Sequence, residues 1–189
     1  MWVTGAYLPE LTHGLRSGTL QQDERHVEEA ALRKIRAYLD TSVFGGVHDQ
    51  QFSEASRRLF DRVHRGDFIV LVSAETLREL ARSPEDVQST WQGLSPEQVD
   101  EVVLNAEVND LAAEYVRAGV LGEASMADAL HVAAATVAGA DVILSWNFRH
   151  IVNFNRIRGF NSVNVALGYR TMTILSPLEV AYEDEEEGI

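Results

Sequence analysis

Three acidic side chains stand where segments of regular structure are predicted to end or begin, and together they suit metal-dependent chemistry. Asp40 ends a short apolar stretch, Glu79 lies six residues beyond the run FIVLVS (68–73), and Asp128 opens an Ala-rich helical stretch. Converging carboxylates repel one another, so a site built from them needs a divalent cation. Ligation by oxygen alone favours Mg²⁺ or Mn²⁺. Such a cation activates water and stabilises a leaving alkoxide, which is the chemistry of phosphodiester hydrolysis.

Each acid also has a purely structural explanation. Asp40 fits a turn that ends a strand, and Glu79 fits an exposed helix position. Ser125 and Asp128 fit a capping box at a helix start. His131 lies three residues after Asp128 and is interpreted as a hydrogen-bonded packing residue of an apolar helix. The case for chemistry therefore depends on whether the three acids converge.

The elements that must position these acids alternate between strands and helices. This alternation predicts an α/β fold with a mainly parallel sheet. In such folds the working residues lie beyond the carboxyl ends of the strands, which is where Asp40 and the segments after Ser73 and Ser145 are expected. Strands are predicted at 37–39, 68–73, 141–145 and 171–177, and helices at 24–36, 50–65, 73–81, 84–92, 96–118, 125–138 and 156–168.

Composition sets broad limits. The 189 residues, 46% of them hydrophobic, suit one α/β domain with some extra length. The absence of cysteine excludes disulfides and thiolate metal sites. No apolar run approaches the roughly 20 residues that span a bilayer, and the N-terminus lacks the basic start and apolar core of a secretory signal. We therefore expect a cytoplasmic protein with no membrane contact.

The charge is unevenly distributed. A formal net charge of −13 argues against a general nucleic-acid coat protein. Residues 142–178, however, contain no Asp or Glu and hold four arginines, a histidine and five asparagines. This stretch is either a chance gap in acids or a locally basic surface. In the second case Arg149, Arg156 and Arg158 are the candidates for RNA contact, with a loop predicted between residues 153 and 169.

Three segments resemble the PIN-domain family, in particular the VapC-type toxins of bacterial toxin–antitoxin pairs. They are YLDTSVF (38–44), VSAETLREL (72–80) and MADALHVAAATVAGADVILSWNFRHI (126–151). The resemblance implies a three-layer α/β/α sandwich with a central, mainly parallel sheet. It also implies a Mg²⁺- or Mn²⁺-dependent endoribonuclease that acts as the toxin of such a pair.

The resemblance assigns roles to individual residues. Asp40, Glu79 and Asp128 correspond to the catalytic, metal-binding acids, and Ser42 to a hydroxyl in the substrate site. Asn147 stands where the family often has a fourth acid, and an amide brings no charge to a second ion. A catalytically weak or inactive PIN-fold module that binds RNA or protein therefore remains the alternative.

The resemblance covers about 35–178. It leaves 1–34 as an N-terminal arm with a short helix and 179–189 as an acidic tail. The implied partners are RNA, an antitoxin that blocks the acidic groove, and a second copy in a homodimer.

Two other folds fit the sequence less well. A haloacid-dehalogenase phosphatase needs Asp-x-Asp where this chain has Asp40-Thr41-Ser42, and a receiver domain needs a late lysine where the only lysine is Lys34.

Overall fold

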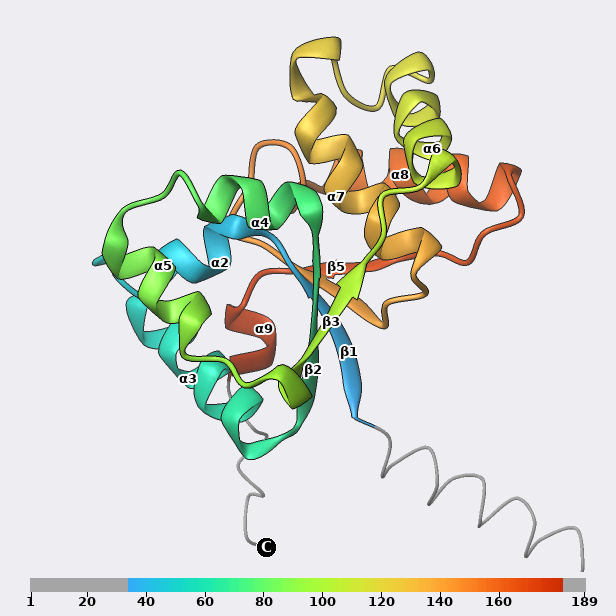
Figure 1. Cartoon of the computed structure of the whole chain (residues 1–189). Coiled ribbons are helices and arrows are strands. Elements are labelled where there is room, and N and C mark those ends of the chain that lie inside the picture. The colour runs from blue at the N-terminus through green and yellow to red at the C-terminus, as the bar shows by residue number, and fades with distance from the viewer. Residues whose placement is uncertain (1–33, 182–189) are drawn as a thin grey trace, which may run out of the picture. The chain divides into compact units, whose positions relative to one another are not determined.

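Five parallel strands form a single sheet in the order β3-β2-β1-β4-β5 (Figure 1). The computed structural model describes residues 34–181, and all structural statements concern these residues. β1 lies at the centre, paired with β2 on one side and β4 on the other. The strands are β1 (Ile35–Leu39), β2 (Phe68–Ser73), β3 (Val99–Val102), β4 (Val142–Leu144) and β5 (Thr173–Leu175).

Helices cover both faces of this sheet (Figure 1). α7 and α6 pack together on one face, with α8 beside α6, and α3 and α9 pack together on the other. The predicted three-layer α/β/α sandwich is therefore confirmed. The α-helices are α2 (Thr41–Gly46), α3 (Ser53–Arg65), α4 (Ala74–Leu80), α5 (Glu85–Gln92), α6 (Ala106–Arg117), α7 (Met126–Val137), α8 (Phe154–Ala166) and α9 (Leu178–Ala181), with short 3₁₀ turns at Pro96–Gln98 and Glu123–Ser125.

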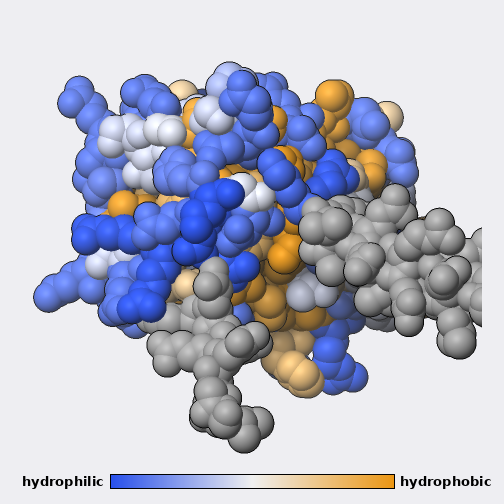
Figure 2. Space-filling model, turned by 90° about the horizontal axis from the view of Figure 1, so that it is seen from below, coloured by the Kyte–Doolittle hydropathy of each residue, from blue (hydrophilic) through white to orange (hydrophobic). Residues whose placement is uncertain are grey.

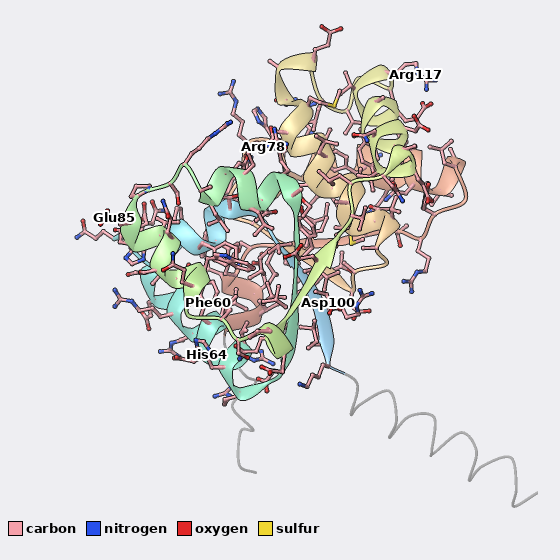
Figure 3. All side chains as sticks on the ribbon, viewed as in Figure 1. Phe60, His64, Arg78, Glu85, Asp100 and Arg117 are labelled. Carbon is pink, nitrogen blue, oxygen red and sulfur yellow. The ribbon has the colours of Figure 1, made fainter. Side chains whose placement is uncertain are left out.

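Two apolar clusters hold the layers together, because successive side chains of a strand point to opposite faces. In β1, Tyr38 belongs to the cluster beneath α6 and α7, whereas Ala37 and Leu39 belong to the cluster beneath α3. The same alternation gives Ile143 to the first cluster and Leu144 to the second. Side chains fill the space on both sides of the sheet (Figure 3). The central strand thus has a fixed register, which fixes where Asp40 emerges.

The helix predicted at 96–118 is wrong in its first half. Ser95 and Gln98 do form a capping box, but it closes a single 3₁₀ turn. β3 follows at the sheet edge and pairs in parallel with β2. Its central residues, Asp100 and Glu101, are exposed, so this four-residue strand has no apolar run to reveal it. The helix proper begins after Asn105, whose side chain accepts a hydrogen bond from the Val108 amide.

Other differences are local. Gly45 and Gly46 are the last two residues of α2. α8 confirms the helix predicted at 156–168, so the segment between 153 and 169 is mostly helix rather than loop. α9 (Leu178–Ala181) extends into the segment 179–189 that was predicted as an acidic tail. Of the helix predicted at 24–36, residues 24–33 lie outside the described residues, and residues 35–36 belong to β1.

Some apolar surface remains on the described part of the chain. Ile35 and Leu178 are among its exposed large side chains. Figure 2, a view from below Figure 1, shows apolar residues reaching the surface of the described part of the chain. None of the described helices has the length and hydropathy to cross a membrane.

Candidate active site

The candidate site lies where the strand order reverses. The chain leaves β1 toward β2 on one side of the sheet and later returns to β4 on the other. In an open parallel sheet this reversal opens a crevice beyond the carboxyl ends of the two strands. Asp40 follows β1 there, and Ser145 follows β4. The site that the sequence predicted is thus at the expected edge of the sheet.

Asp40 is buried and held by hydrogen bonds on both of its oxygens. Its Oδ1 accepts from the Ser42 amide at 3.2 Å, and its Oδ2 accepts from the hydroxyls of Ser42 at 2.7 Å and Ser145 at 2.5 Å. The first of these bonds caps α2. The structural explanation of Asp40 as a turn residue is therefore correct, and it coexists with a fixed position for the carboxylate.

A compact group of potential metal ligands surrounds this carboxylate. Among the described residues, Asp40, Glu79 and His131 each offer a ligand atom, and these atoms lie within 4.8 Å of one another. Glu79 reaches the group from α4, where its Oε2 accepts a hydrogen bond from the Thr41 hydroxyl. His131 Nε2 lies 3.3 Å from the same oxygen. The structure thus brings Asp40 and Glu79 together, as predicted, and adds a histidine that the sequence analysis left out.

The buried His131 ring is oriented by Tyr38. Its Nδ1 lies 2.9 Å from the Tyr38 hydroxyl, which is 2.8 Å from the Ser73 hydroxyl. A hydrogen bond at one ring nitrogen fixes which nitrogen is free for a metal. When Nδ1 carries the hydrogen, Nε2 directs its lone pair at the Glu79 carboxylate. That contact is repulsive unless a proton or a cation lies between the two groups.

Hydrogen bonds and nearby charges favour the ionised forms of Glu79 and His131. Burial alone would raise the pKa of Glu79, but hydrogen bonds from His131 and Thr41 outweigh it and hold the pKa below its usual value. Burial alone would likewise lower the pKa of His131. The Tyr38 hydroxyl, the hydrogen bond to Glu79 and the charge of Asp40 outweigh burial and raise the pKa of His131 well above its usual value. Both pKa shifts favour the charged forms of the two groups, an imidazolium facing a carboxylate.

Asp128 belongs to a neighbouring cluster. Its Oδ1 accepts a hydrogen bond from the Asn147 amide nitrogen at 2.7 Å, and its Oδ2 lies 2.8 Å from His150 Nδ1. The Asn147 backbone amide donates to the Ser145 hydroxyl, which in turn donates to Asp40. The third predicted acid is thus connected to the first through Asn147 and Ser145. It is not a member of the close group with Glu79.

The capping box predicted for Ser125 and Asp128 does not form. α7 begins after Ser125, but this residue makes no side-chain hydrogen bond to the helix amides. Its hydroxyl lies 3.4 Å from His150 Nδ1 instead. The structural explanation of Asp128 as part of a cap is therefore wrong, because Asn147 and His150 compete successfully for these side chains.

The predicted substrate residues lie in different surroundings. Ser42 donates to Asp40 and accepts from the Trp146 amide at 2.9 Å, so its hydroxyl is engaged inside the protein. Arg149 is exposed on the loop after β4. Arg156 donates to the Val120 carbonyl, and the Arg158 guanidinium lies 5.8 Å from the Phe154 ring centroid. Their contact with RNA stays a prediction.

Tight packing fixes the loop that carries Asn147. Trp146 Nε1 donates to the Ser56 hydroxyl at 2.9 Å. A Cβ on Gly46 would lie 2.5 Å from both of these atoms, so only glycine leaves room for the bond. By contrast, a Cβ on Gly45 would have its nearest neighbour, Val87, at 4.0 Å.

We therefore expect Gly46→Ala to destabilise the protein by about 1–3 kcal/mol through overpacking. Gly45→Ala is the matched control in the same helix, and it should leave stability unchanged or raise it slightly, because alanine is the better helix former. Urea unfolding measures both. Equal unfolding free energies for the two variants would show that the space around Trp146 is not limiting.

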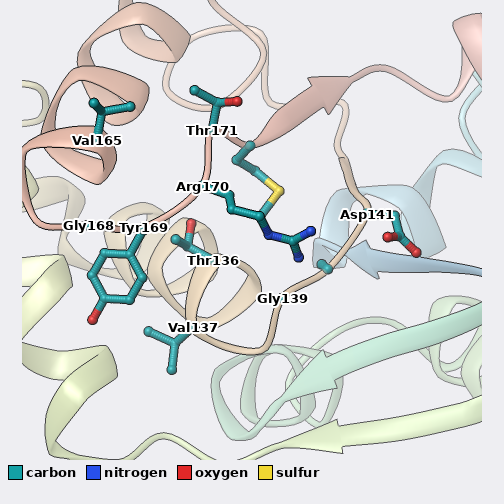
Figure 4. Close-up of a pocket in the computed structure, with 11 residues that line it drawn as sticks. Thr136, Val137, Gly139, Asp141, Val165, Gly168, Tyr169, Arg170 and Thr171 are labelled. Atoms are coloured by element: carbon teal, nitrogen blue, oxygen red, sulfur yellow. The ribbon is translucent and has the colours of Figure 1, made fainter.

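The largest described pocket lies at the other edge of the sheet. It has a volume of about 670 Å³ and includes Asp141, which precedes β4, and Arg170, which precedes β5 (Figure 4). Residues at the amino ends of parallel strands are remote from the crevice at the carboxyl ends. This pocket is therefore separate from the Asp40 group.

Comparisons with known proteins identify a family and similar solved structures. A family model described as "PIN domain" matches residues 36–149. VapBC2 from Rickettsia felis, solved with a DNA fragment from its promoter, is 14% identical with a TM-score of 0.49, and covers 75% of this chain and 98% of its own. FitAB bound to an IR36 DNA fragment is 15% identical with a TM-score of 0.47, and covers 79% and 99%. No curated protein matches the chain.

Proposed function

Because this chain belongs to the PIN-domain family, we propose that it is a metal-dependent endoribonuclease that hydrolyses RNA phosphodiester bonds. The observation that carries the proposal is the group of Asp40, Glu79 and His131 at the point where the strand order reverses. Two carboxylates and one imidazole in a partly buried crevice form a donor set that suits a divalent cation better than any uncharged ligand.

The donor set fits the expected metal. Asp40 and Glu79 supply hard oxygen ligands, which Mg²⁺ and Mn²⁺ both accept. His131 adds a nitrogen, which favours Mn²⁺ over Mg²⁺. When bound, the cation would activate a water molecule and stabilise the leaving oxygen. Thr41 orients Glu79, and the Ser42 and Ser145 hydroxyls hold one Asp40 oxygen.

Asp128 and Asn147 are proposed as the second half of the site. Asp128 is the remaining predicted acid. Each of its oxygens has one contact, with Asn147 or His150, and keeps a second lone pair for a ligand. Both the nitrogen and the oxygen of the Asn147 side-chain amide are hydrogen-bonded. The nitrogen donates to Asp128, and the oxygen accepts from the His150 backbone amide at 3.0 Å. This arrangement favours one tightly held cation, with any second cation arriving with the substrate.

The substrate would enter from the side that carries the arginines. We propose that Arg149 contacts phosphate first, because it is exposed and directly follows the loop of Asn147. Arg156 and Arg158 lie farther along, on α8, and would contact RNA that extends over this helix. Arginine contacts with phosphates would fix the position of the RNA and would not select particular bases.

The biological role that fits best is the toxin of a toxin–antitoxin pair. The resemblance of 38–44, 72–80 and 126–151 to VapC-type toxins supports it. An antitoxin is proposed to bind near Asp40 and Glu79 and to block metal or RNA, and a homodimer is the proposed assembly. Asn147 supports one alternative, in which the chain binds RNA or protein without cutting.

Cleavage of a mixed RNA pool in Mn²⁺, Mg²⁺ or EDTA tests the proposal. We expect cutting with either cation, faster cutting with Mn²⁺, and none in EDTA. RNA that is bound but never cut under any metal would contradict the nuclease and support the binding module.

A further inference from the structure

An aromatic cluster stands beside the candidate site, and one of its rings faces solvent. Phe52 and Trp146 stack with their centroids 4.3 Å apart and an interplanar angle of 17°. The Phe148 ring lies 6.2 Å from Phe52 and 6.0 Å from Trp146. Trp146 is buried at 6% exposure, whereas Phe148 is 45% exposed. The first two rings therefore support the third, which is left open to a ligand.

The support is rigid. The Trp146 indole donates a hydrogen bond to the Ser56 hydroxyl. There is room for this bond because residue 46 is a glycine. Its backbone amide donates to the Ser42 hydroxyl. A ring that is fixed before binding loses little conformational entropy when a ligand stacks on it.

Hydrogen bonds connect this cluster to the proposed metal ligand through Ser42 and Ser145. The Ser42 hydroxyl that accepts from Trp146 donates to Asp40, and Asn147, the residue before Phe148, reaches Asp40 through Ser145. Arg149 follows Phe148 and is exposed. A flat apolar surface, a cation and the metal-binding carboxylate thus occur within one short loop and its direct contacts.

We propose that Phe148 is a stacking platform for one unpaired nucleobase of the RNA. The proposal rests on the proposed nuclease function. Unpaired bases stack on exposed aromatic side chains, whereas a duplex hides its base faces. Arg149, in a stretch free of acidic residues, suits the phosphate that adjoins such a base. The exposed cation beside the ring favours an RNA base, which brings a phosphate with it, over an apolar segment of a protein partner.

Substitutions at Phe148 separate stacking from apolar contact. Wild type, Phe148→Trp, Phe148→Leu and Phe148→Ala are compared on one single-stranded oligoribonucleotide and on versions with a single abasic ribose at each position in turn. Removing one stacked base typically weakens binding by about tenfold or more. We expect that loss in kcat/KM for Phe148→Ala and Phe148→Leu, and near wild-type values for Phe148→Trp. Leu167→Ala, at a similarly exposed residue at the far end of α8, is the control and should change nothing.

The abasic substrates identify the stacked base. At one position the abasic ribose should slow wild type but not Phe148→Ala, because the two changes remove the same contact and are not additive. Additive losses at every position, or equal cleavage of single-stranded and duplex RNA, would overturn the platform while leaving the nuclease intact. Unchanged RNA cleavage together with a weakened complex with a protein partner would assign Phe148 to that partner. If wild type cuts nothing, the nuclease proposal fails, and fluorescence anisotropy with the same oligonucleotides still tests stacking.

Discussion

Replacing Asp40 by Asn is expected to abolish RNA cleavage while the fold persists. The carboxylate is the metal ligand at the centre of the proposed site, and a bound cation contributes several kcal/mol to the transition state. A loss of about a thousandfold or more is therefore expected. Asparagine is also a good N-cap and still offers an oxygen to the Ser42 amide, so α2 should remain intact.

Thermal unfolding with and without Mn²⁺ provides the second readout for Asp40→Asn. A ligand at a hundred times its dissociation constant stabilises the native state by about 2.7 kcal/mol. We expect wild type to gain such stabilisation and the variant to gain little, with similar melting temperatures in EDTA. A variant that cuts RNA at the wild-type rate, or that keeps the full Mn²⁺ effect, would remove Asp40 from the metal site.

Glu79→Gln is expected to have the next largest effect. Glutamine keeps the size of the side chain but loses the charge that faces His131 and the proposed cation. Loss of groups that hold or orient a metal costs about 10–100-fold in affinity or activity, and we expect the upper end of that range here. Glu75 is the matched control. It lies one turn earlier on α4, it is buried, and it pairs with Arg78, so Glu75→Gln should change stability more than cleavage.

The same variant changes the protonation of His131 in the metal-free protein. The hydrogen bond and charge of Glu79 help to raise the pKa of this imidazole, so their removal should lower it. A group whose pKa is raised by folding stabilises the fold at low pH and loses that effect as pH rises through the folded pKa. The Glu79→Gln protein should therefore gain less stability on acidification than wild type. An unchanged NMR titration of His131 would show that the two side chains do not interact.

Much of the fold could be predicted from the sequence where apolar runs and periodicity agree. The predicted strand FIVLVS (68–73) has the same first and last residues as β2, and the Ala-rich stretch forms α7. The rule for carboxyl ends of parallel strands placed Asp40 correctly, since it needs only the strand end and not the strand order. The edge strand β3 could not be found because it is half exposed, and its pairing with β2 depends on contacts distant in sequence.

The candidate site was predicted in part. Asp40 and Glu79 come together as expected, but His131 was interpreted as a packing residue. One signal for its role was available, because residues three apart on a helix share a face and His131 lies three residues after Asp128. The contacts of Tyr38 and Thr41 had no such signal, since each depends on how β1, α4 and α7 pack together.

The chemistry of the RNA ends provides the most direct test of the central claim. Wild-type protein with Mn²⁺ is incubated with a defined oligoribonucleotide in H₂¹⁸O, and the masses of the products are measured by mass spectrometry. Hydrolysis by a metal-activated water predicts one ¹⁸O atom in each new terminal phosphate, no 2′,3′-cyclic phosphate, and no product from Asp40→Asn. A cyclic phosphate, or cutting that survives in Asp40→Asn, would mean that the RNA 2′-hydroxyl attacks and that the Asp40 group is not the centre of the reaction.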